Sequence, residues 1–159
     1  MAVRARRVEP EEPEAVPGEA FRSDYADAFE LTPTDERTAE EWARATLEQG
    51  PVAVRSFVVA GWRYILRLRL GPSSSEDHIA GWPVLLRMPE TVVLGIESGV
   101  LGHARLTFRS STSIVNASSN ITFERRGGRA IWSAAGLLHR RILPYLLERA
   151  ASSPPRSRG

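Results

Sequence analysis

The sequence lacks cysteine and lysine altogether. The absence of cysteine excludes disulfide bonds, thiolate nucleophiles and zinc sites built on thiolates. The absence of lysine excludes Schiff-base chemistry and a phosphate-binding loop that depends on lysine. All 21 basic residues are therefore arginines. Several enzyme classes are thus excluded before any motif is considered.

Long apolar segments are also missing. No stretch approaches the roughly 20 apolar residues that are needed to cross a bilayer. The arginines near the start are not followed by the apolar region of a secretory signal. We therefore expect a cytoplasmic protein with no membrane span.

The common catalytic and cofactor motifs are absent as well. There is no G-x-S-x-G nucleophile elbow, no G-x-G-x-x-G fingerprint and no Walker loop. The three histidines, His78, His103 and His139, are not spaced as metal ligands on one helix. We expect neither a metal nor another cofactor.

Charge is divided unevenly along the chain. Residues 1–50 hold 6 Arg and 13 Asp or Glu, which gives −7, whereas residues 51–159 hold 15 Arg and 6 Asp or Glu, which gives +9. The division favours two parts that complement each other in the fold, and an anion-binding face is the alternative. No basic run is long or interleaved with aromatic residues, so nucleic acid is not expected as a partner.

The 159 residues suffice for one domain with a hydrophobic core. Residues 1–20 are rich in Pro, Glu and Ala, and residues 152–159 read SSPPRSRG. Such segments bury too little apolar surface to become ordered. We predict disordered tails at 1–20 and 152–159 around a single domain at 21–151.

Hydrophobic periodicity predicts the order of the elements. Alternating apolar residues predict strands near residues 25–31, 82–88, 92–96, 106–108 and 115–124. Helical spacing predicts helices near residues 38–49, 51–70 and 132–151. The first of these helices begins with a capping box formed by Thr38 and Glu41.

The helix expected at 51–70 carries an apolar stripe, which indicates burial in the core. The stripe consists of Val54, Phe57, Val58, Trp62, Ile65 and Leu66. The connections between the later strands are short and therefore favour antiparallel neighbours. The sequence thus predicts an α+β fold, in which a curved antiparallel sheet wraps around a long C-terminal helix and a helix pair follows the first strand.

Four segments carry a resemblance to a known family. They read EEWARATLEQGP (residues 40–51), ETVVLGIESG (90–99), LTFR (106–109) and LHRRILPYLLERA (138–150). The chain resembles a bacterial family of unknown function near the START-like (Bet v 1 / polyketide cyclase) helix-grip superfamily. The resemblance implies a cavity between the sheet and the last helix that accepts apolar or amphipathic small molecules. It implies no fixed reaction.

Residues of the predicted sheet and last helix are the candidates for contact with a ligand. The candidates are Trp82, Trp132, Phe108, Leu138, His139 and Arg109. Tryptophan suits a cavity wall because it joins a large apolar surface to one donor, although an ordinary core suits it equally. Arg109 lies on the face opposite Leu106 and could bind a carboxylate at the cavity mouth or extend into water.

Two residues are candidates for acid–base chemistry. His139 could project into the cavity and exchange a proton near neutral pH, or it could bond to backbone beside the helix. Glu97 follows an apolar strand, and burial would raise its pKa if it faced the cavity. Its neighbours Ser98 and Gly99 favour an exposed strand end instead.

Three functions remain open from the sequence. The first is binding of an apolar or amphipathic small molecule, the second is a cyclase or dehydratase that uses one acid–base residue, and the third is an interaction module with an Arg-rich surface. A cavity without titratable groups favours the first function, and His139 or Glu97 inside it favours the second. A homodimer is an open alternative to a monomer.

Overall fold

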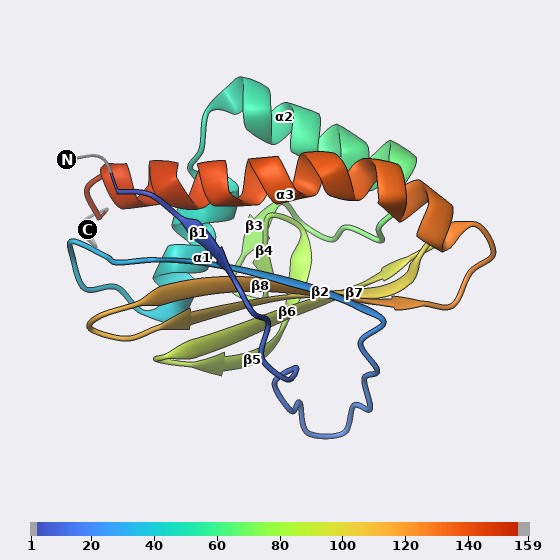
Figure 1. Cartoon of the computed structure of the whole chain (residues 1–159), viewed down its shortest axis with the longest axis horizontal. Coiled ribbons are helices and arrows are strands. Elements are labelled where there is room, and N and C mark those ends of the chain that lie inside the picture. The colour runs from blue at the N-terminus through green and yellow to red at the C-terminus, as the bar shows by residue number, and fades with distance from the viewer. Residues whose placement is uncertain (1–2, 156–159) are drawn as a thin grey trace.

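A computed structural model describes residues 3–155 and shows a sheet with helices on one face (Figure 1). The strands are β1 Arg6–Val8, β2 Tyr25–Leu31, β3 Ser74–Ser75, β4 His78–Ile79, β5 Trp82–Met88, β6 Thr91–Ser98, β7 Gly102–Ser110 and β8 Val115–Phe123. The helices are α1 Ala39–Glu48, α2 Val52–Ala60, the π-helical turn η1 Gly61–Ile65 and α3 Gly128–Ser152. No helix within residues 3–155 is long and apolar enough to cross a membrane.

The eight strands form one antiparallel sheet in the order β1-β2-β8-β7-β6-β5-β4-β3. Strands β3 to β8 are joined to their neighbours by short turns, and β2 returns beside β8. A register shift between Val84 and Leu86 interrupts the β5–β6 ladder, and such irregularities bend a sheet. The α+β class and the helix-grip arrangement predicted from the sequence are therefore confirmed.

Helix α1 begins at the capping box that the sequence predicts. The amide of Glu41 donates to the hydroxyl of Thr38 over 3.1 Å, and the amide of Thr38 donates to the Glu41 carboxylate over 2.8 Å. Helix α3 runs for 25 residues with Pro144 inside it. Both helices pack on the inner face of the sheet (Figure 1).

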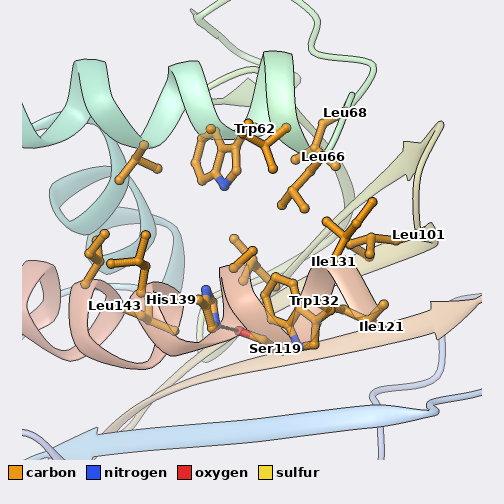
Figure 2. A pocket seen from close by; sticks show the side chains of 18 of the residues that line it. Trp62, Leu66, Leu68, Leu101, Ser119, Ile121, Ile131, Trp132, His139 and Leu143 are labelled. Carbon is orange, nitrogen blue, oxygen red and sulfur yellow. Dashed lines mark hydrogen bonds between the residues drawn. The ribbon is translucent and has the colours of Figure 1, made fainter. Parts of the chain in front are cut away.

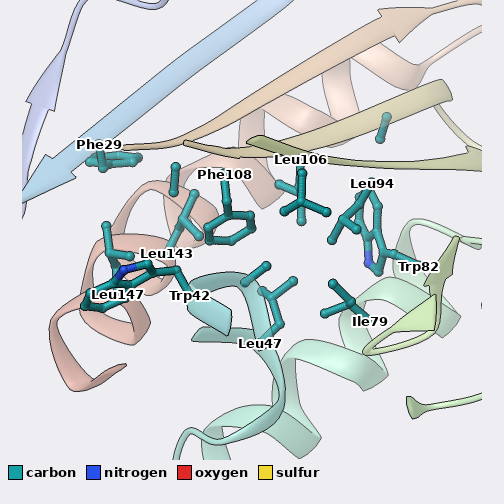
Figure 3. Close-up of a cluster of buried hydrophobic side chains, with 14 of the residues drawn as sticks. Phe29, Trp42, Leu47, Ile79, Trp82, Leu94, Leu106, Phe108, Leu143 and Leu147 are labelled. Atoms are coloured by element: carbon teal, nitrogen blue, oxygen red, sulfur yellow. The ribbon is translucent and has the colours of Figure 1, made fainter. Parts of the chain in front are cut away.

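The solid part of the core lies between α1, the C-terminal half of α3 and the sheet (Figure 3). Trp42 of α1, Leu147 of α3 and Phe108 of β7 are almost completely buried there. Leu47 and Leu143 belong both to this core and to the wall of a cavity beside it. The interior is therefore packed at one end and open at the other.

The helix predicted at 51–70 differs from expectation. It consists of α2 and η1, and neither contains a buried residue. Phe57 and Ile65 of the predicted core stripe are 57% and 58% exposed. The reason is position, because α2 lies beyond α3 and not on the sheet (Figure 1). Most of its apolar stripe lines the cavity, and of the stripe only Leu66 is a buried residue of the core.

The N-terminal segment, which the sequence predicts to be a disordered tail, contains a short strand. Arg6–Val8 form a strand that pairs with β2, and Val16 is buried. The tail is held by charge, because Arg105 on the outer face of the sheet contacts Glu19 at 3.0 Å and stacks on Phe21 at 4.2 Å. At the other end, residues 153–155 follow α3, and residues 156–159 lie outside the described part.

Complementary charge joins the acidic first part of the chain to the basic remainder. Arg109 pairs with Glu14 at 3.1 Å, and Arg87 pairs with Glu40 at 2.8 Å. The Arg105–Glu19 pair is a third link of the same kind. The uneven division of charge in the sequence therefore reflects, at least at these pairs, contacts within the fold.

The substitution Arg105→Met tests what orders the N-terminal segment. Arg105 is only 5% exposed, so its loss should lower the free energy of unfolding by about 2 kcal/mol and speed proteolysis within residues 9–21. Urea unfolding and timed digestion measure both effects. The exposed Arg63 pairs with no described carboxylate, and Arg63→Met should change stability by less than about 0.5 kcal/mol. Equal effects of both substitutions would contradict the assignment.

Candidate functional site

A cavity of about 660 Å³ lies between α2, η1, α3 and the inner face of β7 and β8 (Figure 2). Its wall is almost entirely apolar. The lining includes Trp62, Leu66 and Leu68 on one side and Ile131, Ala135, Leu138 and Leu143 of α3 on the other. Leu106 and Ile121 contribute from the sheet. The cavity is open to solvent between η1 and α3, where several lining residues are exposed.

Aromatic rings define two sides of the cavity. Trp62 meets Trp82 edge to face, with ring centroids 5.5 Å apart and an interplanar angle of 70°. Trp132 forms a similar pair with Tyr25 at 5.3 Å and lies 5.2 Å from the ring of His139. These contacts hold the aromatic rings in place around a space that no side chain fills.

One corner of the cavity is polar. The Nε2 atom of His139 on α3 lies 2.9 Å from the hydroxyl of Ser119 on β8 (Figure 2). The same atom lies 3.2 Å from a carboxylate oxygen of Asp27 on β2. Asp27 has no exposed surface, whereas the side chain of His139 is 20% exposed. His139 therefore separates a buried carboxylate from the cavity.

Further partners surround Asp27. The hydroxyl of Tyr25 donates to its Oδ2 over 2.6 Å, and Arg140 donates to the Tyr25 oxygen over 3.0 Å. Burial raises the pKa of Asp27, but its contacts with His139, Tyr25 and Ser119 together lower it more. The net pKa lies below its ordinary value. Burial also raises the pKa of Tyr25 to about 12, so this phenol keeps its proton at neutral pH.

The ionised carboxylate determines how His139 is protonated. A carboxylate only accepts hydrogen bonds, so the contact with Asp27 favours the tautomer that carries its hydrogen on Nε2, whereas the Ser119 hydroxyl can either donate to Nε2 or accept from it. The other ring nitrogen, Nδ1, forms no hydrogen bond with any residue in the range 3–155 and faces the cavity (Figure 2). In that tautomer Nδ1 presents a lone pair to whatever occupies the cavity.

The structure brings four of the six predicted ligand-contact residues to the cavity, namely Trp82, Trp132, Leu138 and His139. The other two are corrected. Phe108 points into the solid core and is 1% exposed. Arg109 lies on the outer face of β7, because alternate residues of a strand face opposite sides, and it pairs with Glu14.

The suggestion that Glu97 could face the cavity is also corrected. It directly follows Ile96, whose side chain faces the core, and successive side chains of a strand point to opposite faces. Glu97 therefore lies on the outer face of β6. Its side chain is 53% exposed and pairs with Arg69 at 3.0 Å. Glu97 and His139 are thus on opposite sides of the sheet, and only His139 reaches the cavity.

Asp27, Tyr25 and Ser119 were not identified from the sequence as parts of the site. Asp27 could have been found, because residues 25, 27 and 29 share one face of a predicted strand, and Tyr25 and Phe29 make that face otherwise apolar. A carboxylate on such a face needs a partner. Which partner it has could not be inferred, since Ser119 and His139 are distant in sequence.

No family model and no curated protein matches this sequence. Two solved structures are similar in fold. The solution NMR structure of a protein from Arthrobacter aurescens aligns with a TM-score of 0.44 at 12% identity, covering 81% of this chain and 87% of that chain. The crystal structure of Ara h 8.0201 aligns with a TM-score of 0.37 at 12% identity, covering 81% and 100%. At this distance neither likeness bears on the chemistry of the site.

The substitution Asp27→Asn tests the ionised state of the buried carboxyl. A lowered pKa stabilises the fold above the unfolded value of about 4, and this stability is lost as the pH falls through the folded pKa. The variant should therefore be less stable than the wild type by about 2 kcal/mol near pH 6, and the difference should shrink toward about pH 2.5. Urea unfolding across this range measures it. The exposed Asp77→Asn is the control, and a pH-independent difference for Asp27→Asn would contradict the assignment.

Proposed function

We propose that this protein binds an uncharged apolar or amphipathic small molecule in the cavity, with one hydrogen-bonding group of the ligand directed at Nδ1 of His139. The observation that carries the proposal is an open apolar cavity with a histidine in its wall, oriented from behind by a buried carboxylate. The volume of about 660 Å³ is in the range of small-molecule sites.

The lining favours a ligand without charge. The titratable residues along the cavity are His139, Tyr64 and Arg105, and the guanidinium of Arg105 points to the outer face, where it pairs with Glu19. A charged group would therefore lose its hydration without meeting a fixed counter-charge. A hydroxyl or N–H group, in contrast, finds an acceptor in the neutral imidazole. The best fit is a mostly apolar molecule with one such donor.

A second candidate is an acid–base enzyme, and the pairing of Asp27 with His139 favours it. In such a reaction Nδ1 would take a proton from a carbon next to a carbonyl, and the Asp27 carboxylate would stabilise the imidazolium. The imidazolium would then return this proton to a departing hydroxyl, which leaves as water. This balances as a dehydration with one side chain. The third function considered from the sequence is a non-catalytic interaction module with an Arg-rich surface. A filled interior would favour it, and the interior holds a cavity instead.

Filling the cavity tests the proposed site. Ala135 lines the cavity on α3, and Ala135→Phe should place a ring in the space that the ligand needs. Binding of pyrene, followed by its fluorescence, should weaken by at least about tenfold. Ala130 lies on the exposed side of the same helix, so Ala130→Phe should leave the affinity unchanged. Unchanged binding to Ala135→Phe, with the fold intact by circular dichroism, would place the ligand elsewhere.

Removal of the imidazole tests the polar anchor separately from the cavity. Wild-type protein should bind 1-hydroxypyrene more tightly than pyrene by up to about tenfold, because the hydroxyl donates to Nδ1. In His139→Leu this preference should disappear while pyrene still binds. Competition titrations of both compounds give the ratio. A preference that survives the substitution would show that His139 is not the anchor.

A further inference from the structure

Exposed apolar side chains gather at the mouth of the cavity. Among residues 3–155, eight of the nine large apolar side chains that are exposed lie on α2, η1 and α3. Five of them also line the cavity and are called the rim: Phe57, Tyr64, Ile65, Ile131 and Leu138. Tyr64 is 72% exposed and Ile65 is 58% exposed. Exposed apolar groups that are concentrated in this way mark interaction surfaces on soluble proteins.

The chain segments around the rim contain arginines but no carboxylates. No Asp or Glu occurs in residues 52–75 or in residues 125–147. Six arginines in these ranges are exposed and have no ion pair with any residue that the structure describes: Arg63, Arg67, Arg125, Arg126, Arg129 and Arg141. Arg63 and Tyr64 are adjacent in η1, and Arg141 lies one helical turn from Leu138. The surface around the rim is therefore both apolar and positively charged.

We propose that the rim docks on a lipid membrane whose headgroups are negatively charged. Exposed aromatic and aliphatic side chains partition into the interface between headgroups and acyl chains. Each arginine near an anionic surface adds to this attraction. Arg63 lies on η1 and Arg141 on α3, which also carry rim residues, and no carboxylate in residues 52–75 or 125–147 opposes the approach to an anionic layer.

The same charges disfavour a second copy of this chain as the occupant. A symmetric dimer places one patch against its own copy, so the unpaired arginines of one subunit would approach those of the other. Without carboxylates to separate them, these charges repel. A membrane supplies the opposite charge, and it also supplies an apolar layer for Phe57, Tyr64 and Ile65.

Docking at this place would open the cavity directly onto the bilayer. An apolar ligand could then pass between the acyl chains and the cavity without crossing water. This transfer step rests on the proposed function, whereas docking depends only on the rim and its arginines. Docking is therefore measured on the protein without ligand, and its failure is distinguishable from a failure of ligand binding.

Vesicle flotation tests the inference with the full chain. The protein should float with vesicles of phosphatidylglycerol and phosphatidylcholine in equal amounts, should not float with phosphatidylcholine alone, and should dissociate at high salt. Arg63→Gln should weaken binding about fivefold. Its control is Arg22→Gln, which removes an exposed arginine from the groove on the outer face of the sheet.

A matched apolar pair completes the test. Ile65→Ser at the rim should weaken vesicle binding, whereas Ile114→Ser, in the turn between β7 and β8 that is remote from the cavity, should not. Thermal unfolding confirms that each variant is folded. The inference is overturned if the wild type floats with neither vesicle or equally with both, or if the two isoleucine variants behave alike. It is also overturned if the protein dimerises in solution and Ile65→Ser abolishes the dimer.

Discussion

A carboxylate removed entirely from water requires partners, and for Asp27 these partners connect the first long strand to the last helix. Its contacts with His139, Tyr25 and Ser119 join β2, β8 and α3. The attraction of these partners lowers the pKa of Asp27 more than its burial raises it. The contact joins α3 to the sheet at His139, a residue that also lines the cavity.

The difference between the two ends of the interior follows from where the helices lie. Helix α1 places Trp42 and Leu47 against the sheet and fills one end. Helix α2 lies beyond α3, and the π-helical turn η1 that follows it brings Trp62 against Trp82. Neither element fills the cavity between them and the sheet. The apolar stripe of α2 and η1 covers the cavity and therefore remains partly exposed. The position of these elements away from the sheet thus produces both the cavity and its exposed rim.

Features that depend on nearby residues were predictable from the sequence. The capping box of Thr38 and Glu41, the alternation of the strands and the long last helix were all identified correctly. The burial of α2 was not, because an apolar stripe looks the same whether it meets a packed core or a cavity wall. The N-terminal segment was missed because Glu19 and its partner Arg105 are 86 residues apart. His139 was identified as a candidate, but the carboxylate that orients it lies on a different element.

The central claim is that Asp27 holds His139 with its Nε2 protonated and its Nδ1 lone pair open to the cavity. The ¹⁵N chemical shifts of the His139 ring, measured at roughly pH 8, report this most directly. The account predicts a protonated Nε2, an unprotonated Nδ1, and a change confined mainly to Nδ1 when 1-hydroxypyrene is added. A hydrogen on Nδ1 in the free protein, or no change at Nδ1 on saturation with the ligand, would contradict it.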